Sequence, residues 1–108
     1  MSYKAGDRQI KQSEIEKTKK ISDPSAVSIL FHEKKQELLK LLIENDLNIR
    51  EMENLTKLNP GTIKRHLDDL LEKNLVFQSQ TIKNEYGFTL KYYRAVAKKF
   101  IVNIEWPE

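Results

Sequence analysis

NPGTIKRHLDDLLEKNLV, residues 59–76, combines a Pro-Gly pair typical of turns with a leucine spacing typical of helices. Asn59 has a side chain that caps helices, and Pro60 fits the first helical position, where no amide hydrogen is needed. The pair is therefore predicted to begin a helix over residues 60–73 rather than to end one. Asn74 belongs to a residue type that adopts the left-handed conformation common at helix ends.

The two sides of this predicted helix differ in chemistry. Apolar residues recur at helical spacing and are expected to form its buried face: Ile63, Leu67, Leu70 and Leu71. On the exposed side, Gly61 and Thr62 are small enough for the first turn to approach another molecule closely. Lys64 and Arg65 follow, and long cationic donors at such positions contact base edges or phosphates of DNA. An arginine paired with guanine contributes roughly 1–3 kcal/mol of discrimination.

The residues before this stretch predict further helices. Asp23 and Pro24 are a capping residue and a first helical residue, and an interrupted apolar stripe indicates two helices that meet near His32. Asn48 lies three residues before Glu51, which is a variant of the capping box and predicts a short helix of about nine residues.

The residues after the stretch predict a β-hairpin. LVFQSQTI (75–82) and GFTLKYYRAV (87–96) are rich in β-branched and aromatic residues and are separated by a short polar segment. The final segment, KKFIVNIEWPE (98–108), is compatible with a further strand or with the start of a helix.

A short helix, a tight turn, a second helix and a hairpin in this order predict a winged helix-turn-helix. The fold class is α+β and mainly helical, with three to four helices and a two- or three-stranded β-wing. Residues 1–20 are polar and are expected to form a flexible basic N-terminal arm, disordered or partly helical. Residues 21–108 are expected to form the DNA-binding domain, with the wing at about residues 76–94.

Composition and charge limit the possible functions. The chain has no cysteine, which excludes disulfides and thiolate metal sites, and no apolar run of membrane-spanning length. With no recognisable export signal, we expect a cytoplasmic protein with no membrane partner. Of the charged side chains, six basic and three acidic ones lie in residues 1–20, and thirteen of each sign lie in the rest. Net charge is therefore poor evidence for nucleic-acid binding, and local clusters at residues 54–66 and 79–99 are more informative.

LNPGTIKRHLDDLLEKNLV (58–76) resembles the recognition-helix signature of the ArsR-like winged helix regulators. In that signature a small polar residue and a threonine precede an apolar residue, a basic residue, a histidine and a leucine. The hairpin ending in YYRAVAKKFIV (92–102) is similar to the form common in archaeal members. The resemblance covers about residues 24–102. It implies a homodimer on a partly palindromic operator, with each recognition helix in a major groove and each wing on the backbone or minor groove.

Carried onto this chain, the resemblance gives a set of DNA-binding candidates: Asn59, Gly61, Thr62, Lys64, Arg65 and His66 on the helix, and Lys83, Asn84 and Lys91 on the wing. The namesake members sense metals through cysteine pairs, so that mode of sensing does not carry over. His32 and His66 alone do not suggest a metal site, and no cofactor or small-molecule effector is indicated. Asp68 and Asp69 follow the basic pair by four residues, where ion pairs on the helix surface are expected.

Several alternatives remain open at this stage. The main alternative function is a winged-helix protein interaction module of the transcription machinery, which the neutral charge of residues 21–108 allows. Tyr92, Tyr93 and Trp106 are interpreted as packing or dimer residues in preference to stacking on nucleic acid. The arm is either a tail without a defined role or a segment that adds backbone contacts. No catalytic constellation is visible, so no enzyme is expected.

Overall fold

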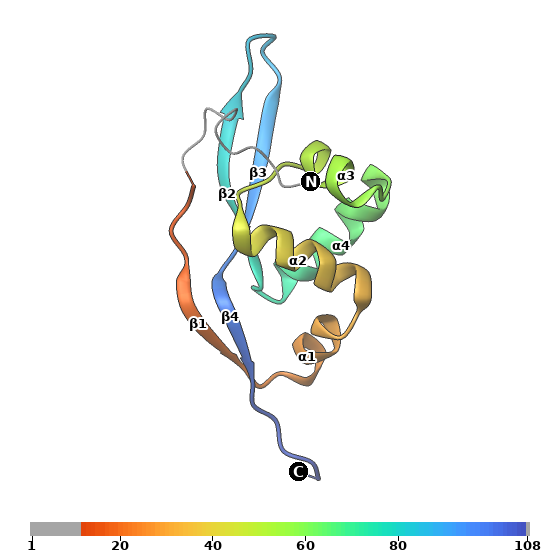
Figure 1. Ribbon diagram of the computed structural model, residues 1–108, viewed down its shortest axis with the longest axis vertical. Coiled ribbons are helices and arrows are strands. Elements are labelled where there is room, and N and C mark those ends of the chain that lie inside the picture. The colour runs from red at the N-terminus through yellow and green to blue at the C-terminus, as the bar shows by residue number, and fades with distance from the viewer. Residues whose placement is uncertain (1–11, 108) are drawn as a thin grey trace.

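The computed structural model describes residues 12–107 of the chain, which form four helices and four strands (Figure 1). In chain order these are β1 (Glu16–Ile21), α1 (Pro24–Leu30), α2 (Glu33–Glu44), α3 (Ile49–Thr56), α4 (Pro60–Glu72), β2 (Val76–Lys83), β3 (Thr89–Ala95) and β4 (Ala97–Val102). Helices α2, α3 and α4 pack together, and the β2–β3 hairpin extends past them as the wing. The predicted α+β winged helix-turn-helix is confirmed.

The first two helices begin at capping residues. Asp23 accepts a hydrogen bond from the Ser25 amide at 3.1 Å, and Pro24 is the first residue of α1, as predicted. His32 separates α1 from α2, where its Nδ1 atom accepts from the Lys35 amide at 3.4 Å. The prediction of two helices meeting near His32 is confirmed.

The helix-turn-helix pair also follows its capping residues. The Asn48 side chain accepts from the Glu51 amide at 2.8 Å, and the Glu51 carboxylate accepts from the Asn48 amide at 3.0 Å. Asn59 caps α4 by accepting from the Thr62 amide at 2.8 Å. Asn74 has φ 57°, so the predicted left-handed stop after α4 is confirmed. Helix α3 has eight residues, close to the predicted nine.

The hydrophobic core lies between these helices and the strands beside them. Leu38 and Leu42 of α2, Met52 of α3, and Leu67 and Leu70 of α4 have no exposed surface. Burying a side chain of this size contributes roughly 1.5–3 kcal/mol, so the core holds the angle between α3 and α4 firmly. The predicted inner face of α4 is confirmed, except that Leu71 is only partly buried.

The wing is a two-stranded antiparallel hairpin. Val76 pairs with Ala95 at its root and Lys83 with Thr89 near its tip. One extra residue, Ser79, shifts the register between Gln78 and Gln80 and forms a bulge. The two predicted strands are thus present, with β3 beginning two residues after the predicted start.

A second, parallel two-stranded sheet corrects the expectation for the N-terminal arm. Strand β1 pairs with β4, with Thr18 opposite Lys99 and Ile21 opposite Val102. The expectation of a disordered or partly helical segment is therefore wrong for residues 16–20, while residues 1–11 lie outside the described part. The division of the chain into arm and domain stays a prediction. Of the two alternatives for the C-terminal segment, the strand is the one observed.

No helix within residues 12–107 combines the length and the apolar character that crossing a membrane requires.

Candidate nucleic-acid interface

Helix α4 has one buried side and one exposed side. Ile63, His66, Leu67 and Leu70 are buried, whereas Gly61, Lys64 and Arg65 are exposed and Thr62 is half-buried. The small residues lie in the first turn and the two cations follow directly. This side is free to meet a ligand at its N-terminal end, the end by which recognition helices enter the major groove.

The beginning of α4 owes its shape to Asn59. Because its side-chain oxygen accepts from the Thr62 amide, the Asn59 side chain has a structural role in addition to its predicted contact. A Cβ atom on Gly61 would lie 3.4 Å from that oxygen, at the limit of ordinary contact. Packing within the chain therefore does not demand glycine here. Glycine at this position instead allows another molecule to approach the first turn of α4 closely.

The predicted ion pairs on α4 form in part. Lys64 Nζ lies 2.6 Å from Asp68 Oδ1, and this contact raises the pKa of Lys64. Asp69 pairs with Lys35 of α2 at 2.8 Å instead of with Arg65. Within residues 12–107 the Arg65 guanidinium forms no ion pair, whereas Lys64 does. The planar set of N–H donors of Arg65 is therefore available to a partner outside the chain.

His66 lies on the inner side of α4. Its side chain is only 9% exposed, and its ring centroid is 5.1 Å from that of His32. Burial lowers the pKa of His66, and the nearby His32, Lys35 and Arg65 lower it further, so the ring is neutral near pH 7. This position favours packing over contact with a DNA phosphate. Among the described residues, no group of three or more side chains is arranged to hold a metal ion.

The wing carries its predicted cations at exposed positions. Lys83 ends β2, and Lys91 lies in β3 opposite Thr81. Asn84 differs, because its side-chain oxygen accepts from the amides of Tyr86 at 3.0 Å and Phe88 at 2.9 Å and so shapes the tip.

Sequence reasoning missed two aromatic side chains at the tip. Tyr86 is 77% exposed and Phe88 is 69% exposed, on either side of Gly87, whose φ of 83° makes the turn. For Tyr86 the available signal is its place in the predicted turn, where apolar residues are unusual, whereas Phe88 lies in the predicted strand 87–96 and gives no such signal.

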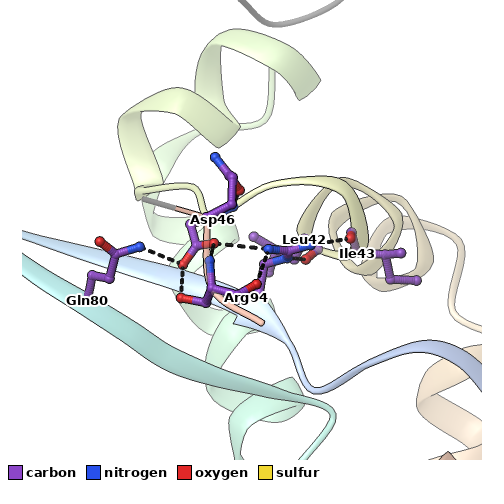
Figure 2. Close-up of polar contacts among 7 residues, drawn as sticks. Leu42, Ile43, Asp46, Gln80 and Arg94 are labelled. Carbon is purple, nitrogen blue, oxygen red and sulfur yellow. Dashed lines mark hydrogen bonds and ion pairs between the residues drawn. The ribbon is translucent and has the colours of Figure 1, made fainter. Parts of the chain in front are cut away.

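A buried ion pair fixes the root of the wing to the helices (Figure 2). Arg94 of β3 is 7% exposed, and its Nη1 atom lies 3.1 Å from Asp46 Oδ1 in the loop after α2. The guanidinium also donates to the carbonyl oxygens of Leu42, Ile43 and Ser13, at 2.9, 2.9 and 2.7 Å. Arg94 therefore ties a wing strand to the C-terminal end of α2.

Asp46 collects donors from three segments. Its carboxylate accepts from the Ser13 amide at 2.8 Å, from the Ser13 hydroxyl at 2.7 Å and from the Gln80 amide group at 2.9 Å. Burial by itself would raise the pKa of Asp46, but the polar side chains of Ser79, Ser13 and Gln80 outweigh it and hold the pKa at about 2. The segment before β1, the loop after α2 and the wing meet at one carboxylate, which is charged at neutral pH.

Sequence reasoning did not find this pair. Arg94 belongs to the predicted basic cluster of residues 79–99, but its charge is buried and neutralised by Asp46, so the exposed cluster is smaller than predicted. The two residues are far apart in the chain, and neither lies in a recognisable motif.

Residues 32–77 match the family model described as "Bacterial regulatory protein, arsR family". This segment is similar to an ArsR-family helix-turn-helix domain. It spans α2, α3, α4 and the first residues of β2, which include the exposed face of α4. This match does not support the resemblance of the hairpin to archaeal members, which stays a prediction. No curated protein sequence matches the chain.

Solved structures share the fold. The transcriptional regulator HlyU from Vibrio vulnificus has 20% identity over 68% of this chain and 71% of that chain, with a TM-score of 0.54. The transcriptional repressor BigR from Xylella fastidiosa has 23% identity over 65% and 63%, with a TM-score of 0.56. The homodimeric winged helix-turn-helix DNA-binding domain Mb0332 from Mycobacterium bovis has 19% identity over 68% and 63%, with a TM-score of 0.54. At these identities the similarity establishes the fold.

Proposed function

We propose that the chain is an ArsR-like transcriptional regulator that binds specific sequences in double-stranded DNA, with α4 as the helix that reads the major groove. The observation that carries this proposal is the two-sided character of α4. Lys64 and Arg65 face outward directly after a small first turn, while Ile63 and Leu67 anchor the helix from behind. The similarity of residues 32–77 to the family's helix-turn-helix supports it.

We further propose that the protein acts as a homodimer on a site with two-fold symmetry. One recognition helix contacts only a few base pairs. Two helices bound one DNA turn apart read two half-sites and so specify a longer sequence. The similar fold of the homodimeric Mb0332 domain supports this proposal. The C-terminal end of the chain lies at the end of the molecule opposite the wing tip (Figure 1). Ile104 and Trp106 are exposed apolar residues near this terminus and offer surface for such an interface.

The proposed protein is a DNA-binding protein and not an enzyme, and it works in the cytoplasm. Its specificity resides in α4, whereas Lys83 and Lys91 of the wing add contacts to the DNA backbone. Metal sensing through cysteine is excluded, because the chain has none.

Selection of binding sites from random duplexes tests the proposal. We expect wild-type protein to enrich a two-fold symmetric site, and we expect Arg65→Ala to lose the preference at one position of each half-site, at a cost of about 1–3 kcal/mol. Lys99→Ala, which removes an exposed cation from β4, is the matched control and should enrich the wild-type site.

Two results would count against the proposal. An unchanged site with Arg65→Ala would remove this residue from the reading set. If wild-type protein enriches no site, and its binding to duplexes disappears as salt is raised, the protein interaction module becomes the better hypothesis.

A further inference from the structure

A concave cleft lies between the helix-turn-helix and the wing, with a volume of about 270 Å³. Three separate elements line it: the start of α3 with Arg50, the recognition helix with Lys64, and β3 with Lys91 and Tyr93. The walls thus come from parts of the chain that the core and the Asp46–Arg94 pair hold in fixed relation. A ligand in the cleft would touch the reading helix and the wing at the same time.

Three cations converge on this cleft, one from each element. Arg50 and Lys91 are exposed, and neither has a recorded carboxylate partner among residues 12–107. Lys64 also contacts Asp68, in an exposed ion pair that leaves the ammonium group two further hydrogens to donate. No acidic side chain of the described residues lines the cleft.

The N-terminal end of α3 also faces the cleft, since Asn48 and Arg50 both line it. Amides at this helix end are already occupied, because Asn48 and Glu51 form a capping box in which the Glu51 carboxylate accepts from the Asn48 amide. The positive charge of the cleft therefore comes from its three cationic side chains. The remaining lining is apolar and includes Ile49 and Leu90. Cations from three elements around one cleft are an environment that suits a single compact anion.

We propose that this cleft holds one phosphate group of the DNA backbone between Arg50, Lys64 and Lys91, and thereby locks the wing and the reading helix onto the same strand. The inference rests on the proposed DNA-binding function and deepens it in two ways. It adds Arg50, which the sequence did not single out, to the interface. It also moves Lys64 from base reading to the backbone, which leaves Arg65 as the long side chain that reads bases.

A double-mutant cycle tests whether the cations share one phosphate. Arg50→Gln and Lys91→Gln should each weaken binding to the selected site and to a shuffled duplex by the same factor, without changing the preferred sequence. If both hold one phosphate, the double variant should lose clearly less than the product of the two single losses. The slope of log affinity against log salt should fall by about 0.9 in the double variant, as for one phosphate contact.

The matched control replaces Lys83, which lies nearer the wing tip and does not line the cleft. Arg50→Gln combined with Lys83→Gln should show independent losses. All replaced side chains are exposed, so circular dichroism should show unchanged melting. Independent losses for Arg50 and Lys91, or no loss for Arg50, would overturn the shared phosphate.

Two further outcomes separate the sources of failure. If wild-type protein shows no salt-dependent binding to duplexes, the proposed function fails and this inference fails with it. If duplex binding is intact in Arg50→Gln, but inorganic phosphate produces saturable NMR shifts of the wild-type Arg50 side chain, the cleft takes a free phosphate and its assignment to DNA is wrong.

Discussion

Asp46 and Arg94 carry opposite charges in a place that is almost closed to water, with relative exposures of 0% and 7%. Such a pair gains little stability over a well-packed apolar pair, but removing one partner costs about 3–5 kcal/mol because the other charge is left buried and uncompensated. The contribution of the ion pair is to fix the position of β3 relative to the helices. The planar guanidinium with four acceptors fixes where β3 leaves the helices.

At the residue scale, Asp46 predicts how stability depends on pH. Its pKa is about 2 in the folded protein, against 3.8 ordinarily. Because the folded state binds this proton more weakly, the contribution of Asp46 is fully present above the ordinary value and is lost as pH falls through the folded value. It amounts to about 2 kcal/mol. Urea unfolding of the wild type at a series of acidic pH values should show this loss, and Asp46→Asn should lack it.

A graded variant sharpens that measurement. Ser13→Ala keeps the carboxylate but removes the hydroxyl that donates to it at 2.7 Å, so the pKa of Asp46 should rise toward its ordinary value and the acid-dependent loss should shrink. If Asp46→Asn unfolds with the same acid dependence as the wild type, other groups carry the effect and the account of the pair is wrong.

At the scale of the element, the start of α4 separates two roles of Asn59. As a cap it accepts from the Thr62 amide, so Asn59→Ala should lower the free energy of unfolding by about 1 kcal/mol. Asn59→Asp keeps the cap but places a negative charge at the proposed DNA surface. We therefore expect Asn59→Asp to unfold like the wild type and to bind duplexes more weakly, as measured by denaturation and by titration with DNA.

The outcome decides whether the side chain is close to DNA. Asn59→Ser, which caps without charge, is the control and should change both measurements little. Duplex affinity unaffected by Asn59→Asp would limit Asn59 to the capping role.

Helices α1 to α4 could be predicted because their signals are local. Asn48 and Asn59 act on amides three residues away, and the leucine spacing of α4 repeats within two turns. The exposed positions of Lys64 and Arg65 follow from the same periodicity. The partners of Asp46 and the residues that share the cleft with Arg50 could not be predicted, since they come from segments that only the folded chain brings together.

At the scale of the whole molecule, the parallel pairing of β1 with β4 joins segments near the two ends of the described chain. A polar stretch such as β1 shows no local preference for a strand, because its pairing partner lies far along the sequence. Local sequence alone therefore predicts an arm for residues 1–20 and cannot indicate the strand. The wing continues directly into this second sheet, since β4 follows β3 after a single residue.

A cysteine pair tests this arrangement in a chain that has no cysteine of its own. Thr18 and Lys99 are register partners, and neighbouring strands place their Cα atoms at a separation that a disulfide can span. Thr18→Cys with Lys99→Cys should oxidise readily. The bridge should raise the free energy of unfolding by about 4 kcal/mol, the chain-entropy value for a loop of this length.

The control exploits the alternation of side chains along β4. Thr18→Cys with Lys98→Cys places the second sulfur on the opposite face of the sheet, so it should remain reduced under the same conditions. Equal oxidation of both pairs, followed by non-reducing electrophoresis and thiol titration, would contradict the parallel register.

The buried pair also restricts how this sequence can drift over generations. If Asp46 is replaced first, the Arg94 guanidinium is left buried without a counter-charge. If Arg94 is replaced first, the same happens to the Asp46 carboxylate. Either single replacement therefore passes through a protein of low stability. Replacement of both at once, by apolar residues of similar volume, avoids that penalty. Positions 46 and 94 lie 48 residues apart in the chain, and they are expected to change together in related sequences or not at all.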